Sequence, residues 1–433
     1  MKPNNYNRLI LVLLALIGQL AHSQEALTVD QDRLEKSILD LGKIGFDDSG
    51  TQRVAFSNED LEGRKFVIQM MEDAGMEVTI DFAGNIIGHM EGTDPDLAPI
   101  SFGSHIDTVP NGGNYDGCVG SMAAIEIVRI LQLNNFQPRH SFELIIFSNE
   151  EGGVMGSRAI SGKLPEEALS VVNSTGYSMG EGIDRLGGDQ KKIEEVIRKK
   201  GEVAAFVELH IEQGGLLEQA GLQIGIVEGI VGLNWWDVTF KGFANHAGTT
   251  PMDQRQDALL AAAQFIQMVN EVALERDGRQ VATVGRIKAL PGAPNVIPGE
   301  VVLSLEIRDL SSEVIQEVYN TIVAKANEIQ SNSGISIEFE ALSTTGIPAL
   351  TDPMVQQQIE ASTKELGLSF QYMPSGAGHD AQDMALITPT GMIFVPSKGG
   401  ISHSPQEFTS AEDMANGANV LLRTLIKLDK VLD

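Results

Sequence analysis

Cysteine and positive charge are both scarce in this sequence. Cys118 is the only cysteine among 433 residues, which excludes an intramolecular disulfide, so stability must come from a large core or a bound metal. A small buried thiol explains Cys118 better than a nucleophile or a metal ligand. Lys and Arg total 31 against 59 Asp and Glu. This balance argues against a nucleic-acid-binding surface, because phosphates are bound through clustered basic side chains.

Long apolar runs are also missing after the first 23 residues, so no later segment is expected to span a membrane. At the start, two basic residues precede the apolar run Leu9–Ile17, and Ala21 and Ser23 are small residues at the positions that a signal peptidase reads. This pattern predicts a signal peptide over residues 1–23, cleaved before Gln24, and an exported protein that is periplasmic or secreted. The alternative is an uncleaved anchor, which would need about 20 apolar residues.

The remaining chain alternates between helical and strand patterns. Apolar residues spaced three and four apart predict helices at Gln31–Leu41, Asn58–Asp73 and Val119–Leu131. Continuous apolar runs predict strands at Glu77–Ile80, Ile100–Phe102, Phe142–Phe147, Ala204–Leu209 and Met392–Val395. Such runs are typical of strands covered on both faces, so we expect an α/β fold with a mixed sheet flanked by helices.

Metal-binding residue types follow four of these strands. In chain order they are His105, the pair Glu150–Glu151, His210 and His403. Sites in open α/β sheets form beyond the carboxyl ends of the strands, so these side chains are expected to converge. Any one histidine alone has a simpler explanation as a hydrogen-bonded structural residue. Together with Asp116 in a glycine-rich loop, the group indicates a metal site, with zinc first and manganese, cobalt or nickel next.

The number of ligand-type groups indicates two ions. Three histidines, one aspartate and one glutamate exceed what a single tetrahedral ion needs. If Asp116 bridges, each ion has three protein ligands and an open position for water, as in two-metal hydrolases. The second glutamate is then available to take a proton from that water.

The segment 221–342 has a different pattern. Its order of β-β-α-β-β-α-β elements predicts a smaller, open-faced α+β domain of the ferredoxin-like type, inserted into the larger one. The catalytic domain then consists of residues 24–220 and 343–433.

Two polar residues of the inserted segment are candidates for binding. His246 lies in a run of loop-forming residues that does not fit a core histidine. Arg308 follows an apolar run, where a carboxylate-bearing ligand is one partner for its charge. An internal salt bridge with Glu306 or Asp309 is the alternative.

The motifs GSHIDT, NEEG, ELHIEQG, ANHAGTTPMDQRQDALLAA, SLEIRDL, SGAGHDAQDM and SHSPQE make the sequence recognisable in combination. It resembles the amidase/carbamoylase branch of the dinuclear-zinc aminoacylase and carboxypeptidase family. That branch contains N-carbamoyl-L-amino-acid hydrolases, allantoate amidohydrolases and β-ureidopropionases. The resemblance covers about Leu34 to Leu428.

The resemblance implies a role for each metal ligand. His105 and His210 are expected to hold one ion, and Glu151 and His403 the other, with Asp116 as the bridge.

It also implies the catalytic and binding residues. Glu150 is expected to be the general base, and Asp107 to fix the tautomer of His105. The inserted domain is expected to form a homodimer and to bring His246 over the partner's site, where it stabilises the oxyanion. The expected substrate-binding residues are Gln213, His246, Asn295, Arg308, Gly378 and His379.

The expected activity is hydrolysis of a linear amide or ureido C–N bond in a small carboxylate substrate, foremost an N-carbamoyl-L-amino acid. A hydroxide held between the two ions attacks, and Glu150 transfers the proton. Two alternatives stay open: a dipeptidase or N-acyl-amino-acid amidase on the same scaffold, and a non-catalytic exported binding protein. The adjacent glutamates Glu150 and Glu151 argue against a pure binding protein, which has no use for a base beside a metal ligand.

Overall fold

A computed structural model describes residues 27–433, and their side chains except those of residues 343–345. The chain forms two compact units. Unit 1 comprises the described residues up to Glu228, with Thr351–Met373 and His379–Asp433, and unit 2 comprises Gly229–Leu350 and Pro374–Gly378. The expected signal peptide lies outside the described residues. Within 27–433, no helix combines the length and apolarity that a membrane span requires.

The main sheet belongs to unit 1 and is mixed, as the sequence predicts. Among the strands of unit 1 its order is β8-β17-β7-β5-β6-β4-β3, and β16 also pairs with β8. The central strands β17, β7, β5 and β6 run parallel, and antiparallel strands follow at both ends. The strands are β3 (Glu77–Ile80), β4 (Ile86–Met90), β5 (Ile100–His105), β6 (Phe142–Phe147), β7 (Ala205–Ile211), β8 (Ile224–Ile230), β16 (Phe370–Ser375) and β17 (Thr390–Val395).

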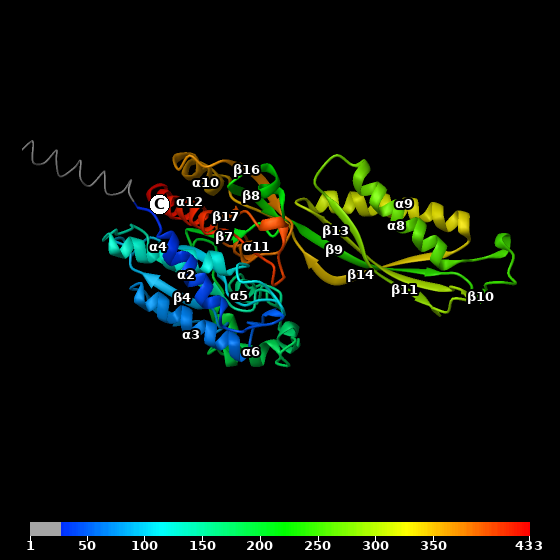
Figure 1. The fold of residues 1–433 in the computed structure, drawn as a ribbon, viewed down its shortest axis with the longest axis horizontal. Helices are drawn as coiled ribbons and strands as arrows, with labels where there is room; N and C mark the ends of the chain where they lie inside the picture. Colours follow the sequence, from blue (N-terminus) through cyan, green and yellow to red (C-terminus); the bar gives the residue numbers. More distant parts are fainter. Residues whose placement is uncertain (1–26) are drawn as a thin grey trace, which may run out of the picture. The chain divides into compact units, whose positions relative to one another are not determined.

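Helices cover this sheet, so its central strands are buried. They are α2 (Gln31–Gly42), α3 (Asn58–Asp73), α4 (Cys118–Leu133), α5 (Met155–Ile160), α6 (Met179–Arg185), α7 (Leu216–Ala220), α10 (Pro353–Glu365), α11 (Asp380–Met384) and α12 (Ala411–Val431). Every residue of β5, β7 and β17 is buried. Helices α4 and α12 pack against these strands (Figure 1). The largest core cluster joins helices and strands through residues such as Phe102, Leu209 and Leu421.

Short elements and caps complete unit 1. Strands β1 (Phe46–Asp47) and β2 (Gly50–Thr51) form a separate two-stranded antiparallel sheet. Unit 1 also has the 3-10 helices η1 (Glu166–Ser170), η2 (Gln190–Val196) and η4 (Lys398–Gly400). Helix α3 begins where expected, because the Ser57 hydroxyl accepts a hydrogen bond from the Asp60 N–H at 3.0 Å.

Unit 2 has the ferredoxin-like arrangement. Its elements are β9 (Gly232–Lys241), β10 (Asn245–His246), η3 (Met252–Gln254), α8 (Ala258–Glu275), β11 (Val281–Leu290), β12 (Val296–Ile297), β13 (Glu300–Asp309), α9 (Ser312–Ser333), β14 (Ser336–Gly346) and β15 (Ala349–Leu350). The antiparallel sheet has the order β11-β13-β9-β14. Helices α8 and α9 pack on one face of this sheet (Figure 1).

The sequence places the start of the inserted domain too early. The predicted boundary at residue 221 assigns residues 222–228 to the inserted domain, whereas β8, which begins at Ile224, pairs with β17 of the main sheet. Six of the seven residues of β8 are buried, as a strand covered on both faces requires. At the other boundary, unit 2 continues through Leu350 rather than ending at residue 342.

Candidate metal centre and active site

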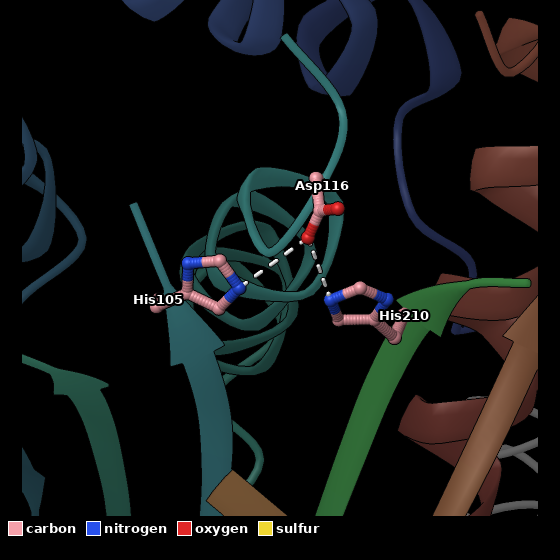
Figure 2. A group of neighbouring side chains, drawn as sticks. All are labelled: His105, Asp116 and His210. Atoms are coloured by element: carbon pink, nitrogen blue, oxygen red, sulfur yellow. Dashed lines mark ion pairs between the residues drawn. The ribbon is translucent and has the colours of Figure 1, made fainter. Parts of the chain in front are cut away.

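Two histidines and one aspartate meet at the carboxyl ends of the central strands. His105 is the last residue of β5, His210 lies near the end of β7, and Asp116 lies in the loop before α4 (Figure 2). One carboxylate oxygen of Asp116, Oδ1, lies 3.5 Å from His105 Nε2 and 3.2 Å from His210 Nε2. All three side chains are at least 94% buried. The expected convergence of these strand ends is therefore present.

Main-chain carbonyls fix the orientation of both imidazoles. His105 Nδ1 lies 3.0 Å from the carbonyl oxygen of Asp107, and His210 Nδ1 lies 2.8 Å from that of Ile211. A carbonyl only accepts, so each neutral ring carries its proton on Nδ1 and presents the Nε2 lone pair to Asp116. This is the tautomer that a metal-binding histidine needs.

The second oxygen of Asp116 faces another pair of ligand-type side chains. His403 Nε2 lies 3.4 Å from Asp116 Oδ2 and 3.5 Å from Glu151 Oε2. Asp116 therefore stands between two groups, His105 with His210 and Glu151 with His403. This is the position of a bridging carboxylate.

The residues present fit divalent metal ions. His105 Nε2 is buried and has no hydrogen-bond partner among the described residues, which is costly for a polar atom unless an ion satisfies it. Two ligands held at about 2.1 Å by one tetrahedral ion are separated by roughly 3.4 Å. The distances around Asp116 are 3.2–3.5 Å. Imidazole and carboxylate are also the donors that zinc and its neighbours prefer.

Burial, together with the neighbouring charges, shifts the pKa values of the groups in this centre strongly. Burial raises the pKa of Glu150 well above its ordinary value, and the charge of His105 opposes only part of this effect. Burial and the nearby Asp116 raise the pKa of Glu151 to about 7. Burial acts against ionisation of Asp116 as well, but contacts with the histidines lower its pKa well below the ordinary value. Asp116 is thus the carboxylate that stays ionised, while Glu150 readily takes up a proton.

Asp107 contacts the glutamate pair rather than the ring it was expected to orient. Its carboxylate accepts hydrogen bonds from the N–H groups of Glu150 and Glu151, both at 3.2 Å. The same carboxylate lies 3.8 Å from His105 Nδ1, beyond hydrogen-bond distance. The carbonyl of Asp107, instead of its side chain, fixes the His105 tautomer. The carboxylate anchors the main chain that carries both glutamates.

Gln213 and His379, two of the expected substrate-binding residues, border the same centre. The side-chain amide of Gln213 donates a 2.6 Å hydrogen bond to Asp116 Oδ2. The His379 ring packs against that of His210 at 4.5 Å between centroids. Burial lowers the pKa of His379 well below its ordinary value, so this ring is neutral.

Glu407 connects the two loops that carry Asp116 and His403. It was given no role from the sequence, although it ends the SHSPQE motif. Its Oε1 accepts hydrogen bonds from the N–H groups of Tyr115 and Asp116 at 2.8 and 3.0 Å. Its Oε2 lies 2.9 Å from the hydroxyl of Ser402, the residue before His403. Glu407 therefore ties the loop that carries Asp116 to the loop that carries His403.

Two further buried acids were also missed. Glu208, two residues before His210 in β7, accepts hydrogen bonds from the Ser104 hydroxyl at 2.7 Å and the Ala381 N–H at 3.0 Å. Asp380 is fully buried, and burial raises its pKa well above the ordinary value. A glutamate inside the apolar run of β7 was a visible signal, because a buried charge needs a specific partner.

The remaining expected site residues belong to unit 2. His246 in β10 is exposed, and its Nδ1 accepts hydrogen bonds from the N–H groups of Gly248 and Thr249 at 3.0 and 3.2 Å. The neutral ring then carries its proton on Nε2, which makes that atom a donor. Asn295 lies beside it, since its carbonyl accepts a hydrogen bond from the N–H of Ala247 at 3.0 Å.

Arg308 forms the internal salt bridge that the sequence left open. Its Nε and Nη2 donate to the two oxygens of Glu306 at 2.8 and 3.1 Å, and Nη1 donates to the carbonyl of Gly376 at 2.7 Å. These bonds use three of the five guanidinium N–H groups. Gly378 lies in the same segment of unit 2, Pro374–Gly378.

The comparisons with known proteins agree with this geometry. The model of peptidase family M20/M25/M40 matches residues 101–427. The chain is 42% identical over 406 residues to an N-carbamoyl-L-amino acid amidohydrolase of Geobacillus stearothermophilus, which covers 92% of this chain and 99% of that protein. It is 35% identical over 388 residues to an allantoate amidohydrolase of Bacillus subtilis, which covers 88% of this chain and 93% of that protein.

A solved structure has the same fold. The crystal structure of an amidase of the hydantoinase/carbamoylase family from Burkholderia multivorans superimposes with a TM-score of 0.87 at 33% identity, covering 93% of this chain and 98% of that one. The resemblance expected from the motifs is confirmed. The chain belongs to peptidase family M20/M25/M40, within its amidase/carbamoylase branch.

Proposed function

We propose that the protein hydrolyses N-carbamoyl-L-amino acids to the amino acid, ammonia and carbon dioxide, with two divalent ions per chain, zinc foremost. The observation that carries the proposal is Asp116, whose two oxygens face separate pairs of ligand-type side chains. Three ligands for each of two ions is the arrangement of two-metal hydrolases. The 42% identity to an N-carbamoyl-L-amino acid amidohydrolase supports the substrate class.

The bound ions would polarise the scissile carbonyl and acidify water, and would be held by His105, His210, Asp116, Glu151 and His403. Proton transfer is the task of the remaining glutamate of the pair.

Glu150 is the general base in this proposal. Its Oε2 lies 3.7 Å from His105 Nε2, so it borders the ligand group. Its raised pKa makes the carboxylate basic enough to take a proton from the attacking water and to return it to the leaving nitrogen. Asp107 holds the main chain of Glu150 in place through the hydrogen bond at 3.2 Å.

Residues of unit 2 bind the substrate and the developing charge. Arg308 keeps two N–H groups beyond those used by Glu306 and Gly376, enough for both oxygens of a substrate carboxylate. His246 presents Nε2–H as a donor for the oxyanion. Following the family resemblance, we assign this donor to the partner subunit's site.

Unit 2 also offers the surface for the homodimer on which that assignment depends. Strand β11 is an edge of its sheet and exposes Ile287 at 50% and Val281 at 51%. The neighbouring helix α8 exposes Leu260 and Leu274. Exposed apolar residues on an edge strand favour pairing with another chain. A second copy of this chain, joined through unit 2, is the proposed partner.

One experiment tests the activity and the metal together. Protein beginning at Gln24 is analysed for metal and assayed with N-carbamoyl-L-amino acids, allantoate, N-acetyl-amino acids and dipeptides. We expect close to two divalent ions per chain and turnover of the carbamoyl compounds. Turnover of dipeptides or N-acetyl compounds alone would show that the enzyme is a dipeptidase or an acylase instead. A metal content of one ion or fewer per chain, measured after zinc, manganese or cobalt has been added, would contradict the dinuclear centre.

A mixing experiment tests the dimer. Chains with His246→Ala and chains with Glu150→Gln are each expected to be inactive, and mixed dimers should regain one complete site if His246 acts on the partner. No recovery after subunit exchange has been demonstrated would mean that each site is built from one chain.

We also propose export, on the strength of the signal-type residues before Gln24. Cell fractionation with N-terminal sequencing tests it. Intact Met1 on a cytosolic product would contradict export.

A further inference from the structure

A cavity of about 370 Å³ lies in unit 2, on the sheet of β11, β13 and β9. Its volume falls in the range of small-molecule sites. Residues that line it include Trp235, Thr283, Gly285, Ser304, Glu306 and Leu342.

The strand alternation assigns the cavity to the face opposite α8 and α9. In β13 the odd-numbered residues Leu303 and Leu305 are fully buried in the core under the helices. Side chains alternate along a strand, so Ser304 and Glu306 face the other side. Trp235 of β9 is paired directly with Glu306 and so faces the same side.

A bulge in the edge strand opens the cavity. Between Thr283 and Arg286 the register of β11 slips by one residue against β13. Gly285 lies in this bulge, and a Cβ added there would meet only the Ser304 hydroxyl, at 3.8 Å. The space at the Cβ position of Gly285 is therefore open, and a side chain at this position would begin in that space.

The charges around the cavity are already paired. Arg286 donates to Asp237, and Glu306 is bound by Arg308 and by the indole N–H of Trp235. Both charged side chains at the cavity therefore already have partners of opposite charge. The indole of Trp235 and the side chain of Leu342 provide apolar surface. The cavity is thus suited to an uncharged, apolar group.

The cavity adjoins the arginine that binds the substrate carboxylate in the proposed function. Arg308 lies two residues beyond Glu306 on the same face of β13, a distance of about 7 Å along the strand. From the carboxyl carbon to the far end of its ring, an aromatic amino acid spans about this distance, and a branched aliphatic one spans less.

We propose that the cavity receives the side chain of the substrate's amino-acid part and selects uncharged, apolar side chains. This inference rests on the proposed function, because it needs the substrate carboxylate on Arg308. Gly285 is then a specificity determinant, since its missing side chain leaves room for that of the substrate.

The test is to fill the cavity. Gly285→Leu, Gly285→Ala and wild-type enzyme are compared by kcat/KM for N-carbamoyl-L-phenylalanine, N-carbamoyl-L-leucine and N-carbamoylglycine. We expect Gly285→Leu to lower the phenylalanine-to-glycine ratio about tenfold or more, Gly285→Ala to lower it less, and N-carbamoylglycine turnover to change little. Binding of N-carbamoyl-L-phenylalanine in a Glu150→Gln background, measured by calorimetry, should weaken in parallel.

Two further variants separate a filled cavity from a damaged sheet. Thr239→Leu adds the same bulk to the uncovered face of β9 at a position that does not line the cavity, and should leave the ratio unchanged. Ser304→Leu fills the same cavity from β13 and serves if Gly285→Leu does not fold.

The outcomes distinguish the inference from the proposed function. The cavity assignment alone is overturned if the wild-type enzyme is active and folded Gly285→Leu and Ser304→Leu enzymes keep its phenylalanine-to-glycine ratio of kcat/KM. If the variants change the oligomeric state but not the ratio of kcat/KM, the cavity belongs to a subunit interface, and the proposed role in substrate selection is also overturned. No wild-type turnover of any N-carbamoyl amino acid overturns both.

Discussion

The two units hold their charged residues in opposite ways. In unit 1, Asp116 and Glu150 are at most 8% exposed, and their positions are set by hydrogen bonds that involve the main chain. In unit 2, Arg308 and Glu306 are 26% and 23% exposed at their side chains and hold each other. A buried carboxylate needs fixed partners, whereas a partly exposed ion pair exchanges partners at lower cost. In the proposed function, unit 1 accordingly holds the metal and transfers the proton, and unit 2 recognises the substrate.

The largest expected effect distinguishes two neighbours within unit 1. Glu150→Gln should keep the metal and lower turnover by about 10²–10⁴-fold, because it removes the base and leaves the ligands. Glu151→Gln should lower metal content and turnover together, because it removes a ligand. Metal analysis beside steady-state kinetics measures both. Equal metal loss in the two variants, or a fully active Glu150→Gln enzyme, would end the proposed division of roles.

A substitution in unit 2 should affect binding instead of turnover. Arg308→Lys removes the planar fork that accommodates a carboxylate. We expect KM to rise by about 10–150-fold, the equivalent of one lost hydrogen bond between charged groups, with kcat and metal content nearly unchanged. Lys241→Met, which removes an exposed ion pair of the same unit, is the matched control and should change neither constant. If Arg308→Lys lowered kcat and metal content instead, the separation between the units would fail.

Substitution of Glu407 should lower the metal affinity of the centre although it replaces none of the proposed ligands. Glu407→Ala takes away the acceptor for the N–H groups of Tyr115 and Asp116 and the contact with Ser402. Such supporting groups contribute about 10–100-fold in metal affinity. Glu407→Gln keeps one oxygen as an acceptor for the N–H groups and should lose less metal affinity. Glu412→Ala, at an exposed position of α12, should lose no metal affinity. Competition with a chelator measures the affinity, and an unchanged value for Glu407→Ala would contradict the role.

The smallest expected effect is on the stability of the metal-free protein. The hydrogen bond with Asp116 raises the pKa of His403 to about 9, so the folded state gains stability that is complete below pH of about 6.5 and disappears as pH rises through 9. The pKa of Glu151, raised to about 7, acts in the same direction. Thermal unfolding of chelator-treated protein should therefore occur at lower temperature as pH rises from 6 to 9. His403→Gln should reduce this slope, and a Tm that rose with pH would refute the account.

The sequence predicted the ends of β5 and β7 well because His105 and His210 follow runs of buried apolar residues. The β5 and β7 runs are wholly buried, and His105 and His210 stand at their ends. What the sequence could not provide is which atom of a residue makes a contact. The carbonyl of Asp107, and not its carboxylate, orients His105, and nothing in residue type or spacing distinguishes these two oxygens.

The sequence also could not predict contacts between residues that are far apart along the chain. The apolar run of β8 has the same pattern in either unit, and only its pairing with β17 assigns it to the main sheet. The contact of Glu407 with the Asp116 loop joins residues almost 300 positions apart in the sequence. Such contacts depend on how loops meet, which local periodicity does not encode.

The alternation along β13 has an evolutionary consequence. Leu303 and Leu305 hold the helices of unit 2, while Ser304 and Glu306 border the cavity on the opposite face. Substitutions on the second face leave the packing of the first intact. If the cavity binds the substrate's side chain as proposed, a lineage with this strand can change the compounds it accepts while selection holds the core and the metal-binding residue types constant.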